Sequence, residues 1–179
     1  MNNNQMVKLI RDVLMSGFTD KGLPIRTKRS YSSVKTSAPN SPTLFIHRIN
    51  TERVGWQSRN TRINNSQPEI EGEQNLITTF QVNALVPSIS PEDETLEDMD
   101  ANDYLTIASM LLQGQVMKET CKSLGVNILP IKPITQNWVQ NENDNWEPEP
   151  MFEVSICHKE ILTTKINKVT EFRSGIYGV

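Results

Sequence analysis

The chain has 179 residues, of which 36% are hydrophobic and 6% aromatic, and its formal net charge is −3. This length favours one domain over residues 1–179, able to bury a core without disulfides or metals. The small net charge gives no overall attraction to nucleic acid or to a membrane. The sequence shows no leader and no apolar run near the roughly 18 residues of a membrane-spanning helix, so we expect a protein of cytoplasmic origin.

The charges are unevenly distributed along the chain. Residues 18–62 hold nine Lys or Arg against two carboxylates, whereas residues 92–103 hold seven carboxylates and no base. Segments of opposite charge can pair between copies of one chain, although both can equally be solvated loops that differ in sign. The basic residues are Lys21, Arg26, Lys28, Arg29, Lys35, Arg48, Arg53, Arg59 and Arg62, and the acidic ones are Glu92, Asp93, Glu94, Glu97, Asp98, Asp100 and Asp103.

The first predicted element is an amphipathic helix. Asparagines at positions 2–4 can cap a helix that runs to about Ser16, and Gly17 is typical of a residue that stops one. The apolar stripe of this helix consists of Met6, Leu9, Ile10, Val13 and Leu14. A long loop rich in Ser, Thr, Pro and basic residues follows over residues 23–42.

Two strands are predicted next. Residues 43–49 form one, and residues 51–62 continue it as a hairpin arm or as a twisted extension. Residues 60–74 are polar, with turn signals at 64–66 and at Gly72. Residues 76–86 alternate most clearly, with one face on a core and the other on water. The core face consists of Phe80, Val82, Ala84 and Val86, and the water face of Thr79, Gln81 and Asn83. Because consecutive strands are usually neighbours, we expect 43–49 and 76–86 to pair antiparallel.

The second half contains an acidic linker, helical segments and further strands. The linker spans residues 88–98, and Thr95 or Asp100 is expected to cap the helix that follows. Gly114 is expected to break that helix and Gly125 to end it. Residues 127–133 are extended and contain two prolines, residues 141–145 form a polar turn, and residues 152–159 alternate as a strand. The region 160–179 is expected to be an edge strand and a tail, with residues 161–169 as the edge strand or arm, whose lysines would keep it from pairing with other strands.

This order of elements predicts an α+β fold. We expect a mostly antiparallel β-sheet with helices packed on one face, together with an extended β-arm or long loops.

No catalytic or metal-binding pattern stands out. His47 and His158 have no Cys or His at metal-ligand spacing, and both are interpreted as strand residues. Cys121 and Cys157 are interpreted as small core residues rather than as a disulfide or a nucleophile. The glycines do not cluster into a phosphate-binding loop. We therefore expect no enzymatic activity and no cofactor, although a hydrolase or nuclease site spread over the sequence stays open as an alternative.

The basic segment invites two interpretations. Arg53, Trp56 and Arg59 interleave charge with an aromatic ring, which would suit phosphate contacts combined with base stacking. The favoured interpretation is that Trp56 packs at a protein interface while the arginines pair with the acidic linker of a neighbour.

Taken together, these segments resemble the neck or tail terminator proteins of tailed bacteriophages, which join the head to the tail. The resemblance covers most of residues 5–160, and it departs from the family in the long acidic linker and the polar tail. It is carried by four places: Leu23-Pro24-Ile25-Arg26 after the first helix; Phe45-Ile46-His47-Arg48-Ile49 leading to Val54-Gly55-Trp56; Phe80-Gln81-Val82-Asn83-Ala84 followed by the helix at 105–112; and Trp146-Glu147 turning into Phe152-Glu153-Val154-Ser155-Ile156.

The resemblance implies a structural protein located in the virion neck or tail and assembled in the host cytoplasm. Its copies would form a ring, a hexamer, between the portal–adaptor complex and the tail proteins. DNA would pass through the lumen without being read, and no membrane would be involved. The alternative is a nucleic-acid-binding module that uses the basic segment 18–62.

We assign candidate residues to subunit contacts in such a ring and to its lumen. The acidic candidates would face either the lumen or the basic loop of the next subunit. In the lumen, their repulsion of phosphates would keep DNA from binding. Subunit or partner contacts are expected from Arg26, Lys28, Arg29, Arg48, Arg53, Trp56, Arg59 and Arg62, and the lumen or interface role from Glu92, Asp93, Glu94, Glu97, Asp98 and Asp100.

Overall fold

The computed structural model describes residues 1–29, 41–64, 67–87, 99–140 and 146–165. In these ranges the chain forms three helices and a six-stranded sheet in the order β1-β2-β3-β6-β4, with β5 also paired to β6. The pairing of β1 with β2 is parallel and the others are antiparallel. The predicted α+β class and the antiparallel pairing of residues 43–49 with 76–86 are therefore confirmed.

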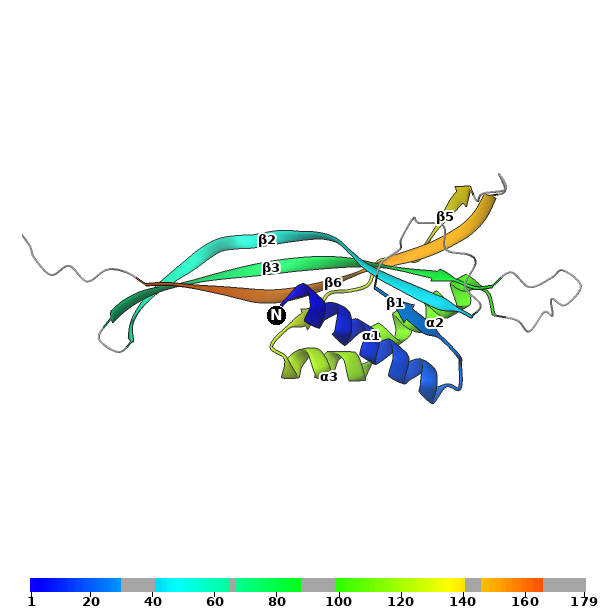
Figure 1. Ribbon diagram of the computed structural model, residues 1–179, viewed down its shortest axis with the longest axis horizontal. Helices are drawn as coiled ribbons and strands as arrows, with labels where there is room; N and C mark the ends of the chain where they lie inside the picture. The colour runs from blue at the N-terminus through cyan, green and yellow to red at the C-terminus, as the bar shows by residue number, and fades with distance from the viewer. Residues whose placement is uncertain (30–40, 65–66, 88–98, 141–145, 166–179) are drawn as a thin grey trace, which may run out of the picture.

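Three long strands form the main part of the sheet. β2 (Thr43–Asn64), β3 (Gln67–Leu85) and β6 (Trp146–Lys165) run side by side through most of its length (Figure 1). With 22 residues, β2 extends over about 70 Å. β3 is central, because β2 pairs with one side of it and β6 with the other. The short strands β1 (Arg26–Lys28), β4 (Asn127–Ile128) and β5 (Thr135–Gln140) border this trio.

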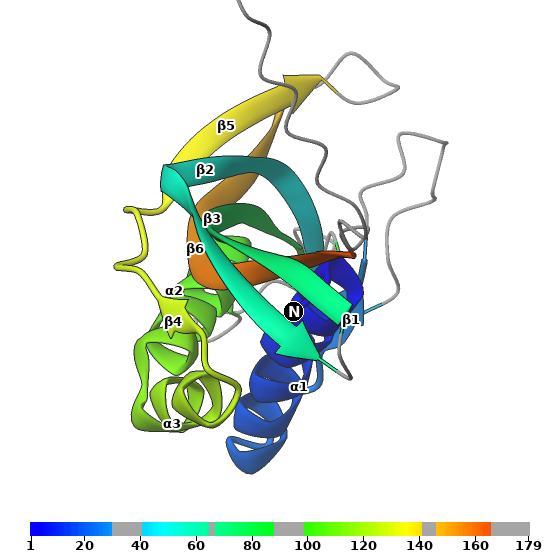
Figure 2. The same cartoon turned by 90° about the vertical axis from the view of Figure 1, so that its left-hand side faces the viewer.

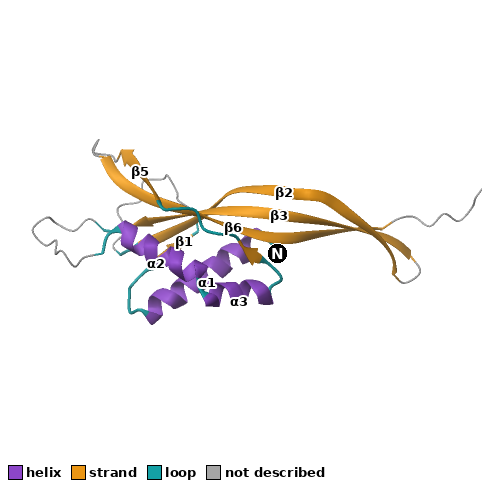
Figure 3. Cartoon of the chain, turned by 180° about the vertical axis from the view of Figure 1, so that it is seen from behind, coloured by secondary structure: helices purple, strands orange, loops and turns teal. Residues whose placement is uncertain are grey.

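All three helices lie on one face of the sheet and cover only part of its length (Figures 1 and 3). They are α1 (Asn3–Asp20), α2 (Ala101–Gln113) and α3 (Gln115–Ser123). Their apolar stripes pack on the alternating residues of the strands, with Ile46, Phe80 and Val154 fully or almost fully buried at the centre. Figure 2, viewed along the strands, shows this layer of helices beneath the twisted sheet.

The helix ends follow local signals that the sequence predicts. Asn2 caps α1, and its side chain accepts a hydrogen bond from the Gln5 N–H at 2.9 Å. Asp100 caps α2 in the same way, as expected for one of the two candidate caps. Gly114 separates α2 from α3, and Gly125, with φ 67°, follows the end of α3.

Other boundaries differ from prediction. Gly17 does not end α1, which continues to Asp20, and the left-handed residue after it is Gly22. Gly72 is no turn and lies inside β3. Residues 161–165 are not a separate strand, because they continue β6. The prediction missed β5 and also β1, which lies inside the predicted loop 23–42, and Asn83, expected to face water, is buried. The expected turns at 65–66 and 141–145, the linker 88–98 and the tail from residue 166 lie outside the described residues.

None of the helices in the described ranges is long and apolar enough to cross a membrane.

Candidate assembly interface

The far ends of β2, β3 and β6 form an arm that the helices do not cover (Figure 1). The pairing of β2 with β3 continues to Asn64 opposite Gln67, and that of β3 with β6 continues to Lys165 opposite Glu69. Every residue of β2 from 48 to 62 is exposed. The arm is thus a three-stranded ribbon held together by backbone hydrogen bonds, with no core of its own in the described residues.

A wide bulge interrupts β2 in the middle of this arm. Val54 pairs with Asn75 and Ser58 with Glu73, so three residues, 55–57, stand opposite the single residue Gln74. Gly55 has φ 70°, a conformation that favours glycine, and the Gln74 side-chain amide donates to the Val54 carbonyl at 3.1 Å. The bulge therefore has a defined shape.

Trp56 lies at the centre of this bulge and is 99% exposed. A tryptophan so fully in water is unusual, because this side chain is normally buried by its own fold or by a partner. Three further apolar side chains on the arm are exposed as well, namely Val54, Ile161 and Leu162.

The charged residues of the arm pair across strands on one face. Arg62 of β2 contacts Glu71 of β3 at 3.0 Å, and Lys159 of β6 contacts Glu73 of β3 at 2.8 Å. A row of glutamates on β3 is thus flanked by cations from both neighbours. Such exposed pairs add little stability. They do set which charges lie next to each other on this face of the arm.

Arg53 and Arg59 lie on the opposite face of the arm. They pair with Leu76 and Gly72 of β3. Even-numbered residues of β3 point to the side of the sheet that the helices cover, so these two arginines point to that side as well. Arg62 pairs with Glu69 on the other face. The arginines of the arm therefore do not form one continuous basic surface.

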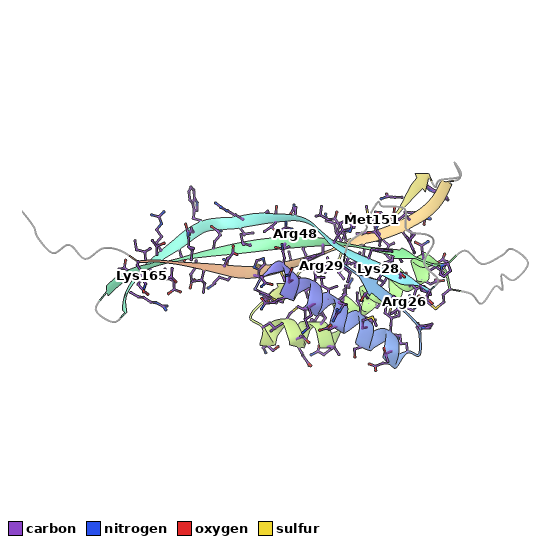
Figure 4. All side chains as sticks on the ribbon, viewed as in Figure 1. Arg26, Lys28, Arg29, Arg48, Met151 and Lys165 are labelled. Carbon is purple, nitrogen blue, oxygen red and sulfur yellow. The ribbon has the colours of Figure 1, made fainter. Side chains whose placement is uncertain are left out.

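The remaining basic candidates lie in the part of the molecule that the helices cover, because β1 pairs with the first residues of β2. Arg26, Lys28 and Arg29 belong to β1 or follow it directly, and Arg48 lies on β2 (Figure 4). Arg29 donates to the Asn4 side chain on α1, and the Lys28 amine lies 5.8 Å from the centre of the Phe45 ring. The structure thus divides the predicted basic residues into a basal group and an arm group.

Only one acidic candidate lies within the described residues. The Asp100 carboxylate accepts a hydrogen bond from the Asp103 N–H at 2.8 Å and so holds the start of α2. Glu92, Asp93, Glu94, Glu97 and Asp98 lie outside the described residues.

The sequence analysis missed two basic residues of the basal group. Lys8 and Arg11 on α1 line a groove of about 310 Å³ together with Lys28 and Arg29. Their spacing of three residues places them on one helix face, which is the signal that could have found them. Their approach to β1 depends on tertiary packing and is not written in the local sequence.

A chain of polar side chains, buried at Thr78 and His158 and exposed at Thr51, crosses the sheet at the edge of the helix layer. The Thr51 and Thr78 hydroxyls lie 3.0 Å apart, and the Thr78 hydroxyl lies 2.9 Å from Nε2 of His158. Burial lowers the pKa of His158, as does the positive amino terminus, while Glu160 opposes the shift. Burial likewise raises the pKa of Tyr104 and of the Cys121 thiol. Within the described residues, no three His, Cys, Asp or Glu side chains gather as they would around a metal ion.

A family model described as E217 gateway protein gp29 matches residues 5–168. Among solved structures, the chain is similar to the sheath/tube terminator of PVC, an extracellular contractile injection system, in its extended state. That similarity has a TM-score of 0.57 at 12% identity and covers 100% of this chain but 64% of the terminator, so it shows a shared fold. None of the curated proteins matches the chain.

Proposed function

The chain belongs to the E217 gateway protein gp29 family, and from this premise we propose that its copies form a ring at the phage neck that joins head to tail and lets DNA pass. Family membership gives the chain a structural role in a phage virion, in association with head and tail components, and agrees with the resemblance to phage neck and tail terminator proteins. The ring, its six copies and the passage of DNA belong to the proposal.

The uncovered arm is the observation that carries the proposal. A ribbon with exposed edges and several exposed apolar side chains is unfavourable on an isolated monomer and invites pairing with another chain. Beyond β1, the outer edge of β2 pairs with no described strand, and neither does the outer edge of β6 over residues 158–165. A neighbour can therefore add a strand to either side of the arm.

Within such a ring, Trp56 would be the central contact. Large aromatic residues that become fully buried on association carry much of the binding energy of an interface. The bulge at residues 55–57 holds Trp56 away from its own sheet, so a pocket on the next subunit can receive it. Arg53 and Arg59, on the face that continues the helix side, would surround this contact.

The acidic linker would serve the passage of DNA. Carboxylates that line a lumen repel the phosphate backbone, so the nucleic acid moves through without binding. Alternatively, these carboxylates would meet basic side chains of a neighbouring subunit, and they would then hold subunits together instead of lining the lumen.

The test compares two exposed tryptophans. Trp56→Ala removes the proposed contact, whereas Trp138→Ala removes a ring on β5 that is 60% exposed. We expect the first variant to weaken ring assembly by about thirtyfold, the effect of losing one interface residue worth about 2 kcal/mol, and the second to assemble normally. Sedimentation and electron microscopy of the purified chain, with virion yield after complementation, provide the measurement. Normal rings and yield with Trp56→Ala would overturn the proposed role of the arm.

Binding of nucleic acid by the basic segment 18–62 remains the alternative. Arg53 and Arg59 share one face of the arm, which is the geometry that contact with phosphates requires. Tight, strongly salt-dependent binding of duplex DNA by the purified chain, with no assembly, would favour this alternative.

A further inference from the structure

A cationic groove separates α1 from the edge of the sheet at β1. Its floor includes the apolar side chains of Val7 and Ile46. Around this floor stand four cationic side chains, Lys8 and Arg11 from the helix and Lys28 and Arg29 from the strand side. The groove holds about 310 Å³, enough for several side chains of an extended peptide.

The described residues around the groove leave much of this charge available. Arg11 contacts Asp12, its neighbour on the helix, at 3.0 Å, and both side chains are about half exposed, so the pair is weak. Arg29 donates to the neutral amide of Asn4. Four cations converging on a small apolar floor create a positive potential that an anionic, partly apolar ligand would complement.

The backbone beside the groove offers a second means of binding. β1 is the last strand of the described sheet, and it pairs only with β2. The Arg26 N–H donates to the Pro42 carbonyl at 2.9 Å, on the β2 side. Because backbone groups alternate along a strand, the N–H and C=O of Thr27 point to the other side, toward the free edge, and Thr27 also lines the groove. An extended peptide can therefore hydrogen-bond to β1 while its side chains enter the groove.

We propose that this groove binds residues 92–98 of a second copy of the chain, which add as a strand to β1. This segment reads Glu-Asp-Glu-Thr-Leu-Glu-Asp, so it brings five carboxylates to the four cations and one apolar side chain, Leu96, to the floor. β3, which precedes this segment, and the start of α2, which follows it, reach the same end of the molecule (Figure 1).

This inference rests on the proposed assembly of copies and adds a contact distinct from the arm. The arm would hold neighbours together through Trp56, and the groove would fix their spacing through charge. Each subunit would give its acidic segment to one neighbour and receive that of the other, which is the head-to-tail arrangement of a closed ring.

Isotope-resolved cross-linking tests which chain occupies the groove. The full-length protein is prepared with natural and with ¹⁵N-labelled nitrogen, mixed, and treated with a carbodiimide that joins lysine amines to carboxylates. We expect links from Lys8 or Lys28 to residues 92–98 in isotope-mixed pairs. Links found only within one isotope would place the segment on its own chain, and absence of these links would mean that the groove binds something else. Either result overturns the proposal.

Charge reversal provides the second measurement. Lys8→Glu with Lys28→Glu is expected to weaken assembly by at least about tenfold, and adding Glu92→Lys and Glu94→Lys in the same chain should restore it. Lys118→Glu with Lys122→Glu on exposed positions of α3 is the charge-matched control, expected to assemble normally. Normal assembly of the first variant, or no recovery with the compensating pair, contradicts the proposal.

The two proposals fail in different ways. Rings that form without the cross-link would remove the groove contact and leave the proposed function intact. Rings that resist Trp56→Ala but fail with the lysine reversals would remove the proposed role of the arm and leave the groove contact intact. If the lysine reversals abolish binding of a duplex oligonucleotide and change neither assembly nor cross-links, the groove binds phosphates instead and the inference is wrong.

Discussion

Gly17 of α1 lies directly against Leu111 of α2, so closely that a Cβ on the glycine would stand 2.4 Å from the leucine Cδ2. This contact explains why a glycine occupies the interior of a helix that it does not end. Beside it, Phe18 stacks on Tyr104 with ring centroids 5.9 Å apart. Because position 17 carries no side chain, the Leu111 side chain can lie against the α1 backbone in this conformation.

We predict that Gly17→Ala lowers the free energy of unfolding when residue 111 is leucine and raises it when residue 111 is alanine. In the native chain, the gain of about 1 kcal/mol in helix propensity is exceeded by overpacking of about 1–3 kcal/mol, so the free energy of unfolding falls. In a Leu111→Ala background the space is open, and the same substitution should raise it. Urea unfolding of the four proteins gives the coupling, and Ser16→Ala, at an exposed site, controls for propensity. Equal effects in both backgrounds would show that the contact imposes no constraint.

Substitutions of Gly55 test whether the shape of the bulge matters for assembly. No atom lies within 4 Å of where its Cβ would stand, so the cost of Gly55→Ala is the left-handed backbone alone, about 1–2 kcal/mol. Gly55→Asn should cost less, because asparagine tolerates this conformation. If the strain flattens the bulge, assembly should fall together with stability for Ala but much less for Asn. Equal assembly in both variants would separate the bulge from the interface.

Thr78 links two strands through a buried hydroxyl. Thr78→Val keeps the shape but removes the partner of Nε2 of His158, whose Nδ1 has no partner among the described residues. Leaving a buried polar group unpaired costs about 1–3 kcal/mol, which chemical denaturation can measure. Thr51→Val, at an exposed position, should cost less. A loss no larger at Thr78 than at Thr51 would mean that water replaces the hydroxyl.

The lowered pKa of His158 predicts a dependence of stability on pH. Burial favours the neutral ring, so the unfolded chain binds the proton more readily than the folded one. The contribution is therefore complete above the unfolded pKa of 6.5 and is lost as the pH falls below it toward the folded value. The free energy of unfolding should decrease more steeply from pH 7 to pH 5 in the native chain than in His158→Gln. Parallel curves would contradict the prediction.

The sequence predicted what is encoded locally. The caps at Asn2 and Asp100, the stop at Gly125 and the alternation through Phe80 and Val82 depend on neighbours within a few residues, and all are found. The family resemblance also holds, because the pattern of elements survives where individual residues do not.

What the sequence did not predict depends on distant contacts. Gly17 has the local signature of a helix stop, yet a contact with Leu111, far along the chain, accounts for it. β5 follows a segment with two prolines and forms because β6 is there to pair with it. The groove joins α1 to β1, whose residues are separate in sequence and individually unremarkable. The roles assigned to the basic candidates and to residues 92–98 stay predictions.

β3 is held by β2 on one side and β6 on the other from Glu69 to Asn83, through both the helix-covered region and the arm. The pairing with β6 has no break in this range, so we expect the ribbon to resist folding over even beside the bulge in β2, and to behave as a beam. A push or twist at the far tip must therefore travel along the strands and reach the helices as a rigid displacement. A displacement at one end of the molecule would then be transmitted to the other end without a hinge.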